Sequence, residues 1–229
     1  MKKVIGVRAV LDLLKLEKPS LINISKGSNV NSKVADIISL ANAKGVKIRW
    51  LKDLSFRVEA LIERESRELG EVLEDICLEK NSLIIVLDHI QDVGNLGSII
   101  RSAESFGVKY LFIPKRSGAK VNDEVSRISA GAIANVEVVE VNINSLLDSL
   151  KKLDFWVYGA DLAASDDFMA TNYSSRSCLV MGNEEKGLSR LTKEKCDFLI
   201  KIPMVGQSNS LNVSVSCGII LSKMSRVLC

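Results

Sequence analysis

The sequence has few of the residues that build metal centres and disulfide frameworks. Its 229 residues include one histidine and five cysteines. The cysteines are widely spaced, without a CxxC pair: Cys77, Cys178, Cys196, Cys217 and Cys229. The acidic pair Asp166–Asp167 has no further ligand-type residues beside it. We therefore expect neither a metal site nor a disulfide scaffold, and we interpret most cysteines, Cys217 above all, as small core residues.

Long apolar runs are also absent. No stretch approaches the roughly 20 consecutive apolar residues of a membrane helix, and the start of the chain has a charged interior and no small-residue cleavage site. We therefore expect a cytoplasmic protein with no membrane segment. The one histidine, His89, would have to carry any histidine-based acid–base chemistry alone, whereas a lone loop histidine is more often a polar surface residue.

The positive charge of the chain is unevenly distributed. The formal net charge is +3, and residues 1–76 hold the whole excess, with 14 Lys and Arg against 11 Asp and Glu, while residues 77–229 hold 17 of each. A weakly basic first third fits an anionic partner such as nucleic acid. An ordinary solvated surface explains so small an excess equally well.

Helix and strand patterns alternate through the first 65 residues. Apolar periodicity predicts helices over residues 7–16, from 32 to Gly45 and over 54–61, and strands over 21–24 and 46–51. This alternation indicates a small α/β module. Residues 63–81 are charge-dense and lack aromatics. We place a linker at 69–81, between a domain of residues 1–68 and a second of 82–229.

The second domain begins with Ser82–Leu87, a continuous apolar run suited to a strand buried on both faces. The alternation then continues, and predicts a parallel sheet covered by helices on both faces. The expected strands are 82–87, 109–113, 136–141 and 155–160, and the expected helices are 95–106, 123–134 and 143–153.

The region from Leu179 to Ser214 holds two more apolar runs, Leu179–Met181 and Leu199–Ile202, each followed at once by polar and glycine residues. We interpret them as two buried strands that deliver two loops side by side. Ligands of parallel α/β sheets bind outside the carboxyl ends of the strands, and glycines such as Gly182 let a ligand approach the backbone. The sequence therefore predicts a ligand site here.

A second candidate lies in the loop and helix start between Asp88 and Arg101. The glycine spacing matches neither a dinucleotide-binding nor a P-loop pattern. Arg101 could grip a phosphate through its planar fork or form a salt bridge with Glu104 or Asp92. Spacing alone leaves both interpretations open.

Several short motifs resemble those of the SpoU branch of the SPOUT RNA methyltransferases. In chain order they are Asn95–Gly97 with Arg101–Ala103, Gly182–Gly187, and Ile202–Met204 with Ser210–Ser214, and a smaller signature lies at Ser129–Ala132. The resemblance covers residues 83–229. The first 65 residues are similar to the family's N-terminal substrate-binding module, an α/β unit like ribosomal protein L30e.

The resemblance implies a trefoil-knotted α/β catalytic domain and an obligate homodimer. It also implies that S-adenosylmethionine is held mainly by the backbone around Gly182, Ile202 and Leu211, with no metal. The reaction of the family is methyl transfer to a ribose 2′-hydroxyl of RNA. With its N-terminal module, the chain is most similar to the 23S rRNA guanosine-2′-O-methyltransferases.

The same resemblance assigns catalytic roles to five residues. Arg101 is the proposed catalytic residue; because a guanidinium resists deprotonation, we favour stabilisation of the alkoxide and phosphate holding over general-base action. Asn95 and Glu184 would orient Arg101 and the ribose, and Ser210 with Asn212 would anchor the active-site loops.

The chain departs from the family pattern at Val93, where proline is usual, at Gly94, where a bulkier residue is common, and at Arg67–Gly70, which stands in place of a His-Gln-Gly signature. Two alternatives stay open: a tRNA or resistance-type rRNA 2′-O-methyltransferase, and a catalytically silent RNA-binding protein on the same fold. The presence of all five catalytic residues favours an enzyme.

Overall fold

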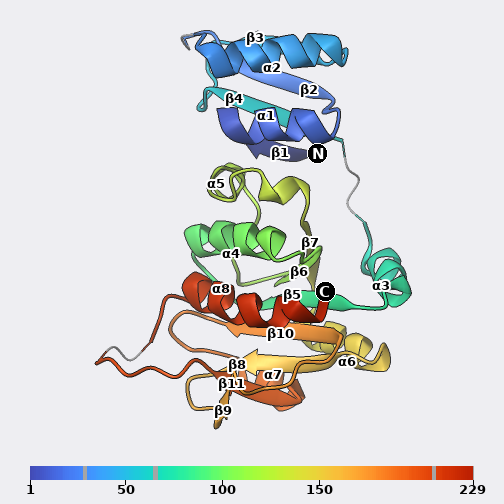
Figure 1. Cartoon of the computed structure of the whole chain (residues 1–229), viewed down its shortest axis with the longest axis vertical. Helices are drawn as coiled ribbons and strands as arrows, with labels where there is room; N and C mark the ends of the chain where they lie inside the picture. The colour runs from blue at the N-terminus through green and yellow to red at the C-terminus, as the bar shows by residue number, and fades with distance from the viewer. Residues whose placement is uncertain (28–29, 64–66, 208–209, 229) are drawn as a thin grey trace.

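A computed structural model describes residues 1–27, 30–63, 67–207 and 210–228. The chain forms two α/β units stacked along the long axis of the molecule, the N-terminal unit at the top of Figure 1 and the larger unit below it. A four-stranded sheet lies in the first unit and a seven-stranded sheet in the second.

The N-terminal unit contains two helices on a mixed sheet. Its elements are β1 (Lys2–Ile5), α1 (Val7–Leu16), β2 (Leu21–Ser25), α2 (Ser32–Ala43), β3 (Lys47–Leu51) and β4 (Val58–Ile62). The strand order is β1-β4-β2-β3, and only β2 and β3 pair in parallel. The predicted helices over 7–16 and from 32 are confirmed, as are the predicted strands that correspond to β2 and β3.

The helix predicted over residues 54–61 is wrong, because the chain there enters strand β4. Val58, Ala60 and Ile62 are almost fully buried. Their spacing of two residues is that of a strand, and β4 pairs with β1 on one side and β2 on the other. A short apolar run does not distinguish the two periods, and the two partner strands decide the outcome.

Part of the predicted linker is a packed helix, α3 (Leu69–Leu78). Glu68 and Glu71 form a capping box at its start, which satisfies backbone N–H groups that a helix start leaves unpaired. Val72 and Ile76, one turn apart, are fully buried against the core of the second unit. Residues 64–66 of the charge-dense stretch lie outside the described residues.

The seven strands of the second unit are all parallel, in the order β7-β6-β5-β10-β8-β11-β9. They are β5 (Ser82–Asp88), β6 (Tyr110–Pro114), β7 (Glu137–Val141), β8 (Trp156–Ala160), β9 (Asp166–Asp167), β10 (Arg176–Gly182) and β11 (Phe198–Lys201). The interior strand β5, between β6 and β10, is buried along its whole length. The predicted α/β class with a parallel sheet is confirmed; the knot and the likeness to L30e stay predictions.

Helices cover both faces of this sheet (Figure 1). The helices are α4 (Val93–Ser105), α5 (Asp123–Ile128), α6 (Ile143–Lys152), α7 (Arg190–Lys195) and α8 (Val213–Met224), with short 3-10 helices η1 (Ala132–Ala134) and η2 (Ser225–Leu228). Leu83, Ile85 and Leu87 of β5 join the core under α4 and α8. Ile84 and Val86 join the opposite core with α3 and α6, so each face of β5 supplies one core.

The helix predicted over residues 123–134 stops at Ile128. Ala130 and Gly131 have φ angles of +52° and +101°, which lie outside the right-handed helical region. At Gly131 a Cβ atom would lie 3.1 Å from Cβ of Ala9 in helix α1. The turn therefore ends the helix and lets the N-terminal unit pack closely.

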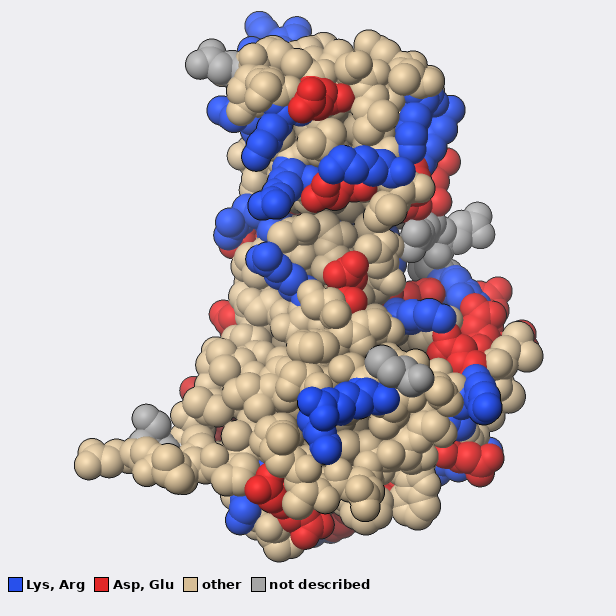
Figure 2. Space-filling model, in the orientation of Figure 1, with Lys and Arg blue, Asp and Glu red and all other residues tan. Residues whose placement is uncertain are grey.

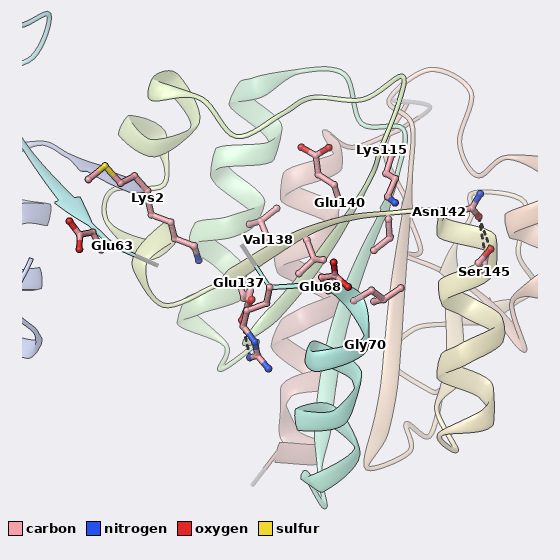
Figure 3. Close-up of a pocket in the computed structure, with 15 residues that line it drawn as sticks. Lys2, Glu63, Glu68, Gly70, Lys115, Glu137, Val138, Glu140, Asn142 and Ser145 are labelled. Carbon is pink, nitrogen blue, oxygen red and sulfur yellow. Dashed lines mark hydrogen bonds and ion pairs between the residues drawn. The ribbon is translucent and has the colours of Figure 1, made fainter. Parts of the chain in front are cut away.

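Two lysines of β1 join the units. Lys3 Nζ lies 3.0 Å from Asp123 at the start of α5, and Lys2 Nζ donates to the carbonyl of Val136 at 3.2 Å. Figure 3 shows a cavity of about 1550 Å³ beside this junction, at the outer edge of strand β7 and the start of α3. Its wall mixes Glu68, Glu137 and Glu140 with lysine and arginine, a distribution without the single positive sign that RNA requires.

Charge differs between the units on the face shown in Figure 2. Lys and Arg side chains are frequent on the N-terminal unit, whereas the surface over α4 and α8 is mostly uncharged, with a few basic side chains. Within the part of the chain that the structure describes, no helix is long and apolar enough to cross a bilayer.

Candidate active site

The loops that follow three neighbouring strands enclose a cavity of about 550 Å³ at the carboxyl edge of the second sheet. Its wall consists of Ala160–Ala163 after β8, Met181–Gly187 after β10, Ile200–Ile202 and Met204 at and after β11, and Ser210–Val213, Ser216 and Ile220 at and near the start of α8. This size lies in the usual range for small-molecule sites.

Strands β10 and β11 deliver their loops to one site, as predicted, but they are not neighbours. β8 lies between them and pairs with both. Its own loop, with Asp161 and Leu162, therefore forms part of the wall, and sequence reasoning missed these residues. The strand was predicted at 155–160, but the order of strands in a sheet is not written in the local pattern.

Gly182, Ile202 and Leu211, the predicted cofactor-binding residues, all line this cavity. Gly182 lies against the backbone of Gly187, where a Cβ atom would come 2.7 Å from the Gly187 carbonyl oxygen. Asn183 and Gly187 close the loop with two backbone hydrogen bonds of 2.9 and 3.0 Å. The glycine at 182 is thus required by the tightness of the loop itself.

The carboxylate of Glu184 projects from this loop onto the start of helix α4. It accepts hydrogen bonds from the backbone N–H groups of Gln91 and Asp92, each at 3.2 Å, and from Nδ2 of Asn95 at 3.1 Å. Burial raises the pKa of Glu184, but the bonds from Asn95 and the backbone outweigh it and hold the pKa below its ordinary value. The unpaired N–H groups at the start of a helix carry partial positive charge, which also stabilises a carboxylate placed there.

Asn95 is buried and links Glu184 to helix α8. While Nδ2 donates to Glu184, Oδ1 accepts from Nδ2 of Asn212 at 2.9 Å. Asn212 caps α8, its own Oδ1 accepting from the backbone N–H groups of Ser214 at 2.9 Å and Val215 at 3.3 Å. We call Glu184, Asn95 and Asn212 the amide relay; it connects the β10 loop with the starts of two helices.

Arg101 lies on α4 beyond the amide relay, with an exposed side chain. Among the described residues, no hydrogen bond or ion pair to its guanidinium is found. The two acids considered as salt-bridge partners are engaged elsewhere: Glu104 accepts from Asn135 at 3.1 Å, and Asp92 caps α4. Asn95 does not bond to Arg101 either. Its side-chain Nδ2 donates to Glu184 and its Oδ1 accepts from Asn212.

Ser210 lines the cavity and is exposed. The structure therefore places Glu184, Asn212 and Ser210 in the cavity wall, joins the first two through Asn95, and leaves Arg101 exposed on helix α4.

The remaining polar candidates do not form a metal centre. Across residues 1–27, 30–63, 67–207 and 210–228 no cluster of three ligand-type residues occurs. Cys217 is fully buried in α8, and burial raises the pKa of its thiol to about 12, which makes it an unreactive core residue as predicted. Cys229 lies outside the described residues. Asp167 accepts from the backbone N–H of Met169 in a turn.

Comparison with known proteins gives concordant results. The model of the SpoU rRNA Methylase family matches residues 82–222. YacO of Bacillus subtilis, a TrmH family protein, is 34% identical over 97% of this chain and 94% of its own. The 23S rRNA (guanosine-2'-O-)-methyltransferase RlmB of Xylella fastidiosa is 31% identical over 97% of this chain and 95% of its own.

Solved structures show the same fold. The SpoU methyltransferase AviRb from Streptomyces viridochromogenes, in complex with AdoMet, superposes with a TM-score of 0.81 at 23% sequence identity. The match covers 98% of this chain and 89% of that one, so both units of the present chain have counterparts there.

Proposed function

The chain belongs to the SpoU rRNA methylase family of S-adenosylmethionine-dependent RNA methyltransferases, and we propose that it methylates the ribose 2′-hydroxyl of a guanosine in large-subunit rRNA, in the cytoplasm. The amide relay is the observation that carries this proposal. It fixes three of the five predicted catalytic side chains, Glu184, Asn95 and Asn212, at the edge of the cavity predicted to hold the cofactor.

The cavity fits the cofactor. Its wall combines apolar side chains from Ile202, Leu211 and Ile220 with the backbone of three loops, which suits a flat adenine ring with polar edges. When bound there, S-adenosylmethionine supplies an electrophilic methyl group on a positively charged sulfur.

Arg101 acts on the RNA side of the reaction. A 2′-hydroxyl is a weak nucleophile, so its attack requires positioning and stabilisation of the developing negative oxygen. A guanidinium keeps its charge at any physiological pH and binds oxyanions through a planar fork. Since no described residue neutralises Arg101, its charge is available for an RNA phosphate and for that oxygen.

The amide relay holds this arrangement rigid. Glu184 anchors the β10 loop to the start of α4, and Asn212 anchors the segment after β11 to the same helix through Asn95. Ser210, two residues before Asn212, lines the cavity. Positioning of this kind contributes to rate because a misplacement of about 1 Å can cost about a hundredfold.

Large-subunit rRNA as substrate rests on two observations. A relative that matches over almost the whole chain is named for 23S rRNA guanosine methylation, and residues 1–76 hold the excess positive charge. A tRNA substrate is the second candidate, because another full-length relative is named for tRNA as well as rRNA.

A homodimer is part of the proposal. Helices α4 and α8 form a shallow groove of about 510 Å³ lined by small side chains, among them Ser98, Ser102 and Gly218, with Val215 half exposed beside them. Small residues let helices from two subunits approach closely, and the surrounding face is largely uncharged (Figure 2). Sedimentation of the purified protein as a monomer at micromolar concentration would contradict this part.

The enzymatic proposal is tested with purified protein, methyl-labelled S-adenosylmethionine, and bulk rRNA and tRNA in separate reactions. We expect label on ribose in large-subunit rRNA. Label in tRNA alone would favour the second candidate. Intact cofactor binding without transfer to either RNA would show a silent RNA-binding protein.

A further inference from the structure

A second cavity of about 650 Å³ lies on the other side of the β10 loop from the cofactor cavity. Residues Asn183–Gly187 line both cavities. The second is also lined by the loop after β5, with His89, Gln91 and Asp92, and by Ser117 and Ser189. Its volume suffices for a nucleobase, and only one loop separates it from the predicted position of the methyl donor.

His89 stands in this wall in a strained backbone conformation. Its φ angle is +65°, in the left-handed region that few non-glycine residues adopt, with Asn, Asp and His the most frequent among them. Its carbonyl oxygen accepts from Nδ2 of Asn183 at 2.9 Å and from Nε2 of Gln91 at 3.2 Å. A residue keeps such a backbone conformation only when contacts with its surroundings hold it there, and residues of this kind are frequent at functional sites.

The imidazole ring is fixed as firmly as the backbone. Nδ1 lies 2.6 Å from Oδ1 of Asp88, which is 1% exposed and accepts at Oδ2 from the backbone N–H of Ser189, also at 2.6 Å. An ionised carboxylate only accepts, so this contact favours the tautomer with the proton on Nδ1. In the neutral ring Nε2 is then a fixed acceptor, and the amide relay makes no use of it.

Two charged residues in the wall of the same cavity, Glu185 and Lys186, have side chains available to bind a ligand. Glu185 and Lys186 use their backbone N–H groups to bond Oδ1 of Asn183, and within the described part of the chain their side chains make no hydrogen bond or ion pair. The cavity thus offers two acceptors, His89 Nε2 and the Glu185 carboxylate, and one cationic donor, Lys186.

We propose that this second cavity holds the guanine base of the nucleotide whose ribose is methylated. His89 and Glu185 accept hydrogen bonds from N1–H and from the N2 amino group, and Lys186 donates to O6. This inference rests on the function proposed above. Two donors beside one acceptor are what guanine presents on its pairing edge; adenine lacks the N2 amino group and presents an acceptor at N1.

The position of the cavity supports the same assignment. A base and the 2′-hydroxyl of its own ribose are attached to adjacent carbons of one sugar, so a base beside Glu185 keeps the hydroxyl near Glu184. Enzymes that do chemistry on a base read the extruded base through its pairing edge, and the same edge is available to an enzyme that acts on the attached ribose. A site built for such bonds rejects a base that leaves its groups unpaired.

The test uses the full chain and an rRNA transcript. The methylated nucleotide is first mapped, and two transcripts are then made with guanosine or adenosine at that position. We compare kcat/KM for both transcripts between the wild type, His89→Asn and Glu185→Gln, with Glu194→Gln on the exposed face of α7 as the matched control. Asparagine tolerates the backbone conformation at 89, and His89 does not line the cofactor cavity.

We expect the wild type to prefer guanosine by at least about a hundredfold. Each variant should lose about tenfold on guanosine and little on adenosine, so that the preference falls, while Glu194→Gln keeps it. Because the readout is a ratio of two substrates, partial unfolding does not change it.

An unchanged preference in both variants would overturn the inference and leave methyl transfer standing. Methylation at a nucleotide other than guanosine would do the same. Absence of any transfer by the wild type would instead refute the proposed function, and this inference with it.

Discussion

Oδ1 of Asn95 accepts a hydrogen bond of 2.9 Å from Nδ2 of Asn212, a residue 117 positions further along the chain. This bond joins the start of helix α4 to the cap of helix α8. Through Nδ2 of Asn95 it continues to Glu184, so one buried amide holds three separate segments at the edge of the cofactor cavity.

The first prediction concerns Asn95→Ala. The substitution removes one hydrogen bond to the Glu184 carboxylate and one from Asn212, two residues that are themselves exposed, and the loss of both bonds destabilises the fold by about 1 to 3 kcal/mol. We expect methyl transfer to fall at least about a hundredfold. Chemical denaturation and turnover assays measure both effects. Asn135→Ala, which removes one exposed bond to Glu104, is the matched control, and equal losses in both variants would contradict the role of the amide relay.

A second prediction follows from the lowered pKa of Glu184. A carboxyl group whose folded-state pKa is below its ordinary value of 4.5 stabilises the fold fully above that value. The contribution is lost as the pH falls from 4.5 through the folded-state pKa. The difference in unfolding free energy between wild type and Glu184→Gln should therefore narrow on acidification, as urea titrations at a series of pH values would show. A constant difference would mean that the ionised carboxylate is not what stabilises the loop.

The third prediction separates Arg101 from cofactor binding. Arg101→Ala should bind S-adenosylmethionine with nearly wild-type affinity, because its side chain does not line the cofactor cavity, yet transfer should fall about a thousandfold. Arg101→Lys should recover only part of it, since a lysine lacks the planar fork. Isothermal titration and single-turnover assays separate the two quantities, with Arg190→Ala on α7 as the control. Parallel loss of cofactor affinity would place Arg101 in the wrong role.

The fourth prediction tests the tight turn after β10. In Gly182→Ala the new methyl group meets the Gly187 backbone, so the loop has to shift; we expect weaker cofactor binding by at least about tenfold and a lower melting temperature. Gly206→Ala is the control, because a Cβ there has nothing within 4 Å. Equal behaviour of the two variants in cofactor titrations would show that the turn tolerates change.

Local patterns in the sequence predicted most elements, since strands such as β5 and helices such as α1 have unambiguous periods. These patterns gave the wrong element where contacts with residues distant in the sequence determine the secondary structure. Residues 58–62 form a strand because β1 and β2 lie on either side of them, and the helix from Asp123 stops where Gly131 meets Ala9 of the other unit.

In the site, too, the sequence predicts individual residues but not the contacts between residues that are distant in the chain. Gly182, Glu184 and Asn212 could be selected from motifs, but the bond between Asn95 and Asn212 spans 117 residues and no local pattern contains it. The placement of β8 between β10 and β11 brings Asp161 to the cavity for the same reason. The isolation of His89 in the sequence predicts a polar surface residue. The position of its ring depends on Asp88, its neighbour in the chain, and through Asp88 on Ser189, which lies far from it in the sequence.

The most direct test is the identity of the methylated nucleoside. Large-subunit rRNA incubated with the purified protein and labelled S-adenosylmethionine is digested to nucleosides, which are separated and identified by mass spectrometry. We predict that the label appears in 2′-O-methylguanosine with wild-type protein and that this nucleoside forms about a thousandfold more slowly with Arg101→Ala. Label on a base instead of a ribose, or no label while cofactor binding is intact, would contradict the account.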